Sequence, residues 1–99
     1  MTEIVCYVAT FEGSHDLGNI IHSGFIFAKR KDALDYLLNG WEEFKPTYMS
    51  RCNRKIIHEY INNSMGPDCD YYRQIVITDE FGYTNIIKLK VLKRIIYLR

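Results

Sequence analysis

The stretch IIHSGFIFAKRKDALDYLLNGW, residues 20–41, holds the two clearest structural signals in this sequence. Residues 20–28 are dominated by Ile and Phe, and their side chains alternate at a period of two, so that Phe25 and Phe27 share one face. This alternation predicts a strand. A helical pattern follows at once, so the two elements are expected to be joined almost without a loop.

The helical pattern consists of apolar residues at the three- and four-residue spacing that forms one stripe. These residues are Ala33, Leu34, Leu37, Leu38 and Trp41. Asp32 can cap this helix or stabilise its first turn. Asn39 and Gly40 tolerate the left-handed conformation that ends many helices. We therefore expect the helix to stop near Gly40.

Two further elements are expected around this unit. Residues 3–11, EIVCYVATF, are apolar on both faces and predict a strand in the middle of its sheet. Residues 12–19, EGSHDLGN, have the composition of a long exposed loop. Pro46 breaks the chain, and a second helix is expected to start at Thr47 or Ser50 and to end in residues 62–67. Its apolar stripe comprises Met49, Cys52, Ile56, Ile57, Tyr60 and Ile61.

The last third of the chain predicts a β-hairpin. Residues 71–78 form one strand, residues 79–82 a turn in which Gly82 takes a positive φ, and residues 83–91 an antiparallel strand with one apolar and one basic face. Residues 92–99 fit a strand or a helix by spacing, and their β-branched content favours a strand.

Together these elements predict one α+β domain over residues 1–99. The expected architecture is a four-stranded, mainly antiparallel sheet in the sequence order ββααββ, with both helices packed on one face because their apolar stripes need a common apolar surface. The expected core residues are Leu34, Leu37, Trp41, Ile56, Ile75, Ile77, Ile87 and Leu89.

The composition supports a single globular domain. The 99 residues are 47% hydrophobic and 25% charged, and no apolar run approaches the roughly 20 residues that cross a bilayer. The N-terminus lacks the cationic start and small-residue cleavage site of a signal peptide. We therefore expect a cytoplasmic protein without membrane contact, whose three cysteines, an odd number with unequal spacing, are reduced thiols.

No catalytic, cofactor or metal site is expected. The candidate nucleophiles and bases sit in no recognisable signature. They are Cys6, Cys52, Cys69, Ser14, His15, His22 and His58. Cys69 lies between two aspartates and is a poor candidate nucleophile. The nearest metal-ligand group, Glu12, His15 and Asp16, lacks the usual spacing, and the glycines at 13 and 18 lack the Lys-Ser/Thr of a phosphate-binding loop.

Basic residues are unevenly distributed. Residues 1–83 hold 8 Lys or Arg against 12 Asp or Glu, whereas residues 84–99 hold five basic residues and no acid. A basic stripe able to neutralise phosphates predicts nucleic-acid binding as an alternative function. Its residues would be Arg54, Lys88, Lys90, Lys93 and Arg94. Alternating lysines also solvate an outer sheet face and discourage edge pairing, so both interpretations stay open.

The aromatic content predicts a protein-binding surface. Eight Tyr, five Phe and one Trp exceed what so small a core can hide, and exposed tyrosines beside charges are typical of protein contacts. The expected protein-binding set is Asp68, Asp70, Tyr71, Tyr72, Asp79, Glu80 and Phe81. The sequence therefore favours a non-catalytic binding protein over an enzyme.

The composition, rich in Ile, Tyr, Asn and Lys, and the length of 99 residues resemble the small accessory proteins of T-even-like bacteriophages. The segment GFIFAKRKDALDYLL, residues 24–38, is also similar to a strand-then-helix unit of short phage and bacterial domains. The resemblance implies an inhibitor that binds a host defence protein in the host cytosol. A nucleic-acid-binding protein and a sponge for a nucleotide signal are the alternatives, and exposed backbone in residues 92–98 predicts a homodimer.

Overall fold

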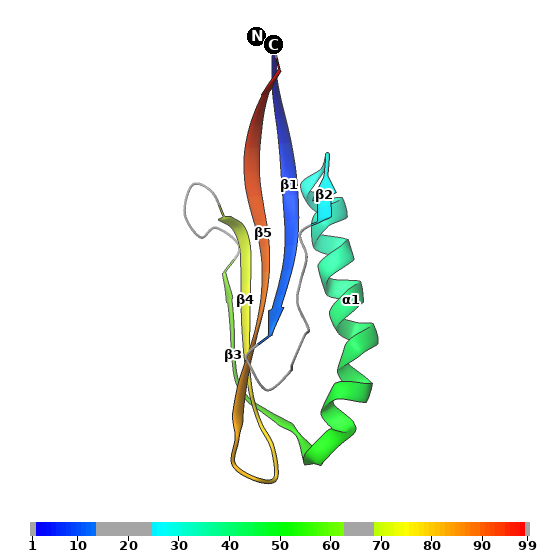
Figure 1. The fold of residues 1–99 in the computed structure, drawn as a ribbon, viewed down its shortest axis with the longest axis vertical. Coiled ribbons are helices and arrows are strands. Elements are labelled where there is room, and N and C mark those ends of the chain that lie inside the picture. Colours follow the sequence, from blue (N-terminus) through cyan, green and yellow to red (C-terminus); the bar gives the residue numbers. More distant parts are fainter. Residues whose placement is uncertain (1, 14–24, 63–68, 99) are drawn as a thin grey trace.

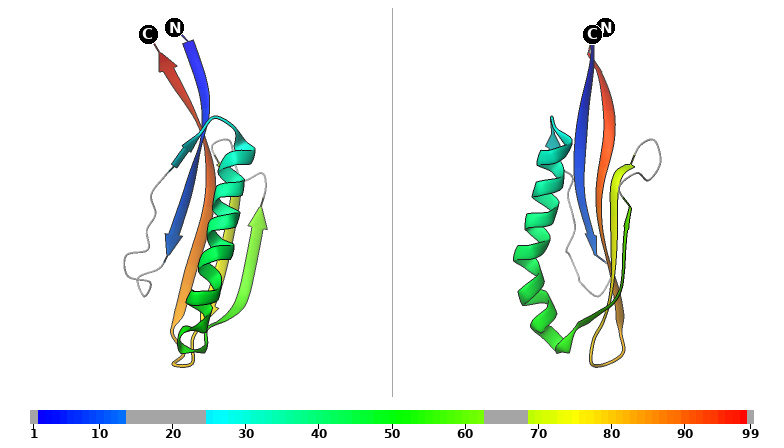
Figure 2. Two further views of the ribbon diagram at one scale, coloured as in Figure 1. Left: turned by 90° about the vertical axis from the view of Figure 1, so that its right-hand side faces the viewer. Right: turned by 180° about the vertical axis from the view of Figure 1, so that it is seen from behind.

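The computed structural model describes residues 2–13, 25–62 and 69–98. In these ranges one sheet of five strands carries a single long helix on one face, and the molecule is elongated, 55 × 22 × 21 Å (Figures 1 and 2). The strand order is β2-β1-β5-β4-β3, and all neighbours are antiparallel. The elements are β1 (Thr2–Gly13), β2 (Phe25–Phe27), α1 (Arg30–Ser50), a 3-10 turn (Arg51–Asn53), β3 (Lys55–Asn62), β4 (Cys69–Thr78) and β5 (Thr84–Leu98).

The predicted ββααββ order with four strands and two helices is wrong, and the first reason is that α1 does not stop near Gly40. The helix continues through Gly40 and Pro46 to Ser50, and it buries Trp41 and Tyr48. A proline inside a helix costs about 3 kcal/mol, whereas burying a large apolar side chain contributes about 1.5–3 kcal/mol. Two buried aromatic residues beyond the expected stop therefore outweigh the local breakers.

The second reason is that the expected second helix is a strand. After α1 the chain turns through Cys52 and Asn53, which have φ values of 52° and 51°, and Lys55–Asn62 then pairs with β4 as β3. The apolar residues of this segment fit a helical stripe, but they are mostly Ile and Tyr, which suit a half-buried strand. Pairing with β4 gives the backbone N–H and C=O groups of these residues hydrogen-bond partners, and it therefore favours the strand over the helix.

The core lies between α1 and the facing side of the sheet. Six of the eight predicted core residues are at most 2% exposed, and Leu34 and Ile56 are half-buried against them. Those six are Leu37, Trp41, Ile75, Ile77, Ile87 and Leu89. The buried cluster also contains residues outside the predicted core list: Ala9, Ala33, Tyr48, Tyr71 and Val91.

The C-terminal hairpin is confirmed. β4 and β5 pair antiparallel, Gly82 has a φ of 86°, and residues 92–98 belong to β5 as a strand. The Asp79 carboxylate stabilises the turn by accepting hydrogen bonds from the backbone N–H groups of Phe81 (2.9 Å) and Tyr83 (3.0 Å). The strand predicted at residues 20–28 is present at Phe25–Phe27, and its residues 20–24 lie outside the described part.

The long N-terminal and C-terminal strands pair with each other inside the sheet. β1 and β5 keep one antiparallel register from Thr2↔Leu98 to Gly13↔Ile87. This register joins the two ends of the chain and places β5 between β1 and β4. None of the described helices is long and apolar enough to cross a membrane.

Candidate binding surface on the open sheet face

The face of the sheet that points away from α1 carries a group of aromatic and basic residues, which we call the open-face site. In β5 the residues Ile87, Leu89 and Val91 are fully buried toward α1, so the intervening Lys88 and Lys90 project from the other side. The same alternation holds in β4 and β3. The open-face site comprises Tyr60, Tyr72, Gln74, Lys88 and Lys90.

The strand register arranges the open-face site in two rows. In the first row Lys90 of β5 lies opposite Tyr72 of β4. In the second row Lys88 lies opposite Gln74, which in turn lies opposite Tyr60 of β3. Directly opposed residues on neighbouring strands have Cβ atoms about 5 Å apart. The register therefore gathers residues from three strands into one compact surface.

The two tyrosines form the aromatic part of this surface. The ring centroids of Tyr60 and Tyr72 are 6.2 Å apart, with an angle of 58° between the ring planes. The Tyr72 hydroxyl donates a hydrogen bond to Gln74 Oε1 at 2.5 Å, and Asn62 Nδ2 donates to the Tyr60 hydroxyl at 3.1 Å. These bonds hold each ring by its polar end. Tyr60 remains 46% exposed, so part of its ring is accessible to a ligand.

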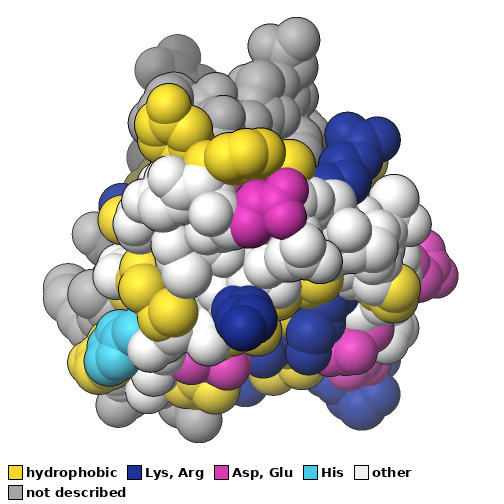
Figure 3. Space-filling model, turned by 90° about the horizontal axis from the view of Figure 1, so that it is seen from below, with side chains coloured by type: hydrophobic (Ala, Val, Ile, Leu, Met, Phe, Trp, Pro, Cys, Tyr) yellow, Lys and Arg dark blue, Asp and Glu magenta, His cyan; other side chains and the backbone are white. Residues whose placement is uncertain are grey.

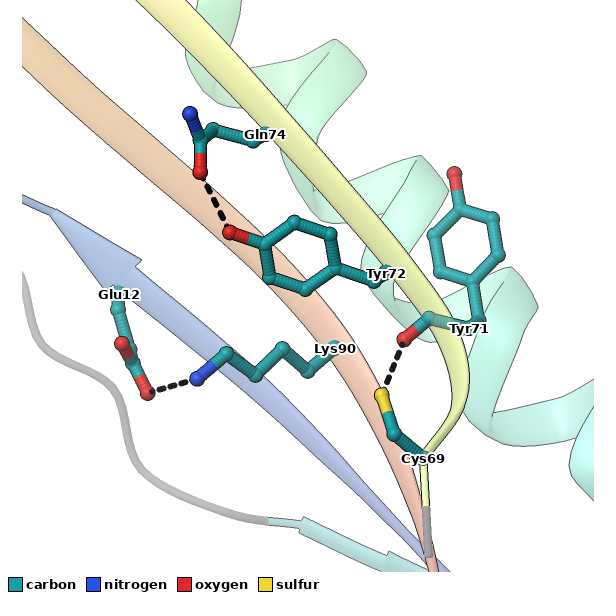
Figure 4. Close-up of polar contacts among 6 residues, drawn as sticks. All are labelled: Glu12, Cys69, Tyr71, Tyr72, Gln74 and Lys90. Carbon is teal, nitrogen blue, oxygen red and sulfur yellow. Dashed lines mark hydrogen bonds and ion pairs between the residues drawn. The ribbon is translucent and has the colours of Figure 1, made fainter. Parts of the chain in front are cut away.

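The lysines carry the charge of the surface. Lys90 Nζ lies 3.3 Å from Glu12 Oε1 of β1, where both side chains are partly exposed. Such partly exposed ion pairs are worth only about 0–1 kcal/mol, so Glu12 holds Lys90 only weakly. Lys88 lines a hollow between β1 and β5 together with Glu12, Gly13 and Ile86. Figure 4 shows Tyr72 between Gln74 and Lys90, with Lys90 reaching toward Glu12.

The structure places three of the five residues predicted for nucleic-acid binding on the open face of β5, and two of these, Lys88 and Lys90, belong to the open-face site. Lys88, Lys90 and Arg94 alternate onto the open face of β5, whereas Lys93 projects from the opposite side of the strand. Arg54 is also on the α1 side. Its guanidinium lies 4.1 Å from the centre of the Tyr48 ring, and its Nη1 donates to the Tyr48 carbonyl at 3.1 Å.

The predicted protein-binding set is divided between the two ends of β4, and Asp68 lies outside the described residues. At the first end Asp70 is 3.5 Å from the Arg30 guanidinium. Tyr71 is 5% exposed in the core, where burial raises the pKa of its hydroxyl. Only Tyr72 of this group joins the open-face site, and Figure 4 shows Tyr71 and Tyr72 on opposite sides of β4.

The other predicted residues lie in the turn at the opposite end of β4. Eight strand residues separate the two groups, which corresponds to about 25 Å. The Asp79 carboxylate is engaged by the turn backbone, and Glu80 Oε2 accepts a 2.6 Å hydrogen bond from Asn53. Phe81 is 67% exposed. Figure 3 views this end and shows hydrophobic, basic and acidic side chains interspersed. The six described residues of this set therefore do not form one acidic patch.

The three cysteines of the described part have different surroundings. Cys6 is buried, Cys52 is exposed in the 3-10 turn, and Cys69 Sγ donates a 3.3 Å hydrogen bond to the Tyr71 carbonyl. No group of three or more His, Cys, Asp or Glu side chains that could hold a metal ion occurs among the described residues. Four earlier candidates lie outside them: Ser14, His15, Asp16 and His22.

Sequence reasoning missed Tyr60 and Gln74 as members of the site, because residues 55–62 were assigned to a helix. The available signal was the run of Ile and Tyr residues, which suits a strand. The resulting class of protein is an antiparallel α+β domain with a helix on one face and an aromatic, basic surface on the other. No protein-family model, characterised protein or solved structure matches this chain.

Proposed function

We propose that this protein is a non-catalytic binding protein that holds single-stranded nucleic acid on the open-face site. The observation that carries the proposal is the register that sets Tyr72 opposite Lys90 and Gln74 between Lys88 and Tyr60. Surfaces that bind single strands combine two components, aromatic rings and neighbouring cations.

Each component has a distinct role. An exposed tyrosine ring stacks on the flat face of a base, which is available only when the base is unstacked, as it can be in a single strand. The lysine ammonium groups neutralise the phosphates that follow each base. The amide of Gln74 can form hydrogen bonds with a base edge. A sheet surface with these groups therefore favours a single strand over a duplex.

The length of the basic row fits a short ligand. Lys88, Lys90 and Arg94 extend over seven residues of β5, or about 20 Å at the rise of a strand. Single-strand-binding folds contact about 4–16 nucleotides. Three phosphate contacts, one of them in competition with Glu12, imply modest affinity that depends on salt.

Fluorescence anisotropy with labelled ten-nucleotide DNA and RNA tests this function. Loss of one stacked base costs about 1–3 kcal/mol, so Tyr60→Leu, which replaces a ring that is 46% exposed and keeps apolar bulk on the strand, is expected to weaken binding about 5- to 150-fold. Tyr36→Leu is the matched control, because Tyr36 is 43% exposed on α1, where it contacts Phe25 and Phe27. Equal affinities for both variants, or no binding of either nucleic acid, would contradict the proposal.

A protein contact at the β4–β5 turn is the second candidate function. Phe81 and Tyr83 are 67% and 65% exposed there, and exposed aromatic residues are typical anchors of protein interfaces. The resemblance to phage accessory proteins would make the partner a host protein. A partner captured from lysate after nuclease treatment and lost with Phe81→Ala plus Tyr83→Ala would support this function. Capture that survives the double substitution would place the contact elsewhere.

A further inference from the structure

The two terminal strands extend beyond the rest of the sheet. β4 pairs with β5 only as far as Leu92, and β2 pairs with β1 only as far as Tyr7. Residues 2–6 and 93–98 continue to pair with each other. We call this two-stranded extension of the described structure the terminal ribbon. Figures 1 and 2 show it projecting past the start of α1 at Arg30.

The terminal ribbon exposes apolar side chains on both of its faces. Two strands alone are marginally stable in water, and the α1 helix does not reach this part. Ile4, Ile96 and Leu98 share one face of the ribbon, and the other face carries a second set of three. The second set consists of Val5, Ile95 and Tyr97. All six side chains are between 40% and 56% exposed.

One edge of the terminal ribbon has no neighbouring strand among the described residues. Residues 93–98 of β5 pair with β1 on one side, and the pairing with β4 on the other side ends at Leu92. Such an edge presents a row of backbone N–H and C=O groups that can pair with another chain. We propose that a second copy of this chain extends the terminal ribbon, with this free edge of β5 pairing antiparallel with the same edge of its partner.

The sequence of the free edge suits pairing with itself. A twofold axis at Ile96 places Arg94 opposite the partner's Leu98 and Ile95 opposite the partner's Tyr97. No like charges are opposed within residues 94–98, and β-branched and aromatic residues form the central cross-strand pairs. Because both copies use the same edge, the contact closes at two chains. The start of β4 at Cys69 is left unobstructed, since the pairing involves residues 94–98.

Light scattering during size exclusion at concentrations from about 1 to 200 µM tests this surface. The chain of 11.7 kDa is expected to give twice its mass at the higher concentrations. Ile96→Lys puts two ammonium groups opposite each other at the axis, and like-charge contacts cost several kcal/mol, so the dimer dissociation constant should rise at least about a hundredfold. Ile57→Lys is the control, because Ile57 is 58% exposed on β3, away from the ribbon.

Amide hydrogen exchange gives a second readout on the unmodified chain. Protection of residues 94–98 is expected to increase with protein concentration, while that of β3 stays constant. A monomer mass at every concentration would overturn the proposal, as would a dimer that Ile96→Lys and Ile57→Lys affect equally. The dimer does not depend on nucleic-acid binding, and a monomeric Ile96→Lys chain that still binds oligonucleotide would separate the two.

Discussion

Substituting Gly40 by alanine tests the most surprising element of the fold, the continuous helix α1. Gly40 lies in the middle of the helix, and a Cβ built on it meets no atom within 4 Å. Glycine inside a helix is about 0.5–1 kcal/mol less favourable than alanine. Gly40→Ala is therefore expected to stabilise the protein by this amount, which raises Tm by roughly 2–8 °C for a chain of this size.

The assay is urea unfolding followed by the fluorescence of the single tryptophan, Trp41. Gly82→Ala is the matched control, because Gly82 has a φ of 86° with no crowding around it, and a left-handed alanine costs about 1–2 kcal/mol. The same substitution should thus have opposite signs at the two glycines. If Gly40→Ala destabilises the protein as Gly82→Ala does, the helix ends at Gly40 and the account of α1 is refuted.

Three further outcomes are expected. Leu37→Ala, which empties a core position that is 2% exposed, should lower the free energy of unfolding by about 2–5 kcal/mol, and a loss below half a kcal/mol would show that the helix phase is wrong. Burial raises the pKa of Tyr71, so the stability that its neutral hydroxyl contributes is present below the unfolded pKa of about 10 and is lost as pH rises through the folded pKa. Unfolding titrations at alkaline pH should therefore show a smaller loss of stability for Tyr71→Phe than for the unsubstituted chain, and identical curves would contradict this. Glu12→Gln removes the carboxylate that competes for Lys90 and should tighten oligonucleotide binding about two- to fivefold by anisotropy, whereas weaker binding would argue against a phosphate at Lys90.

The elements that sequence predicted correctly are those with an unambiguous period. The C-terminal hairpin has odd-numbered apolar residues such as Ile75 and Ile87, and its turn contains a glycine that needs a positive φ. These features are local, so a single sequence carries them. The stop at Gly40 and the break at Pro46 are also local signals, but the burial of Trp41 outweighs them. That burial depends on a sheet whose strands are distant in sequence.

The candidate site was predicted only in part for the same reason. The alternation of Lys88 and Lys90 with buried residues was visible in the sequence, and it places both on one outer face. Tyr60 could not be placed beside Tyr72, because residues 55–62 fit a helical stripe as well as a strand. Tyr71 is buried and Tyr72 lies on the open face, because neighbouring strand residues point to opposite sides of the sheet. The predicted protein-binding set grouped the two tyrosines by composition and did not take this alternation into account.

The salt dependence of single-strand binding tests the open-face site most directly. Each neutralised phosphate on a single strand contributes about −0.7 to the slope of log K against log salt, so Lys88, Lys90 and Arg94 together give a slope near −2. Lys88→Gln plus Lys90→Gln is expected to reduce the magnitude of this slope by about 1.4. Lys31→Gln plus Lys45→Gln on α1 should leave it unchanged. A slope that both double variants change equally, or that neither changes, would contradict the assignment of nucleic-acid binding to the open-face site.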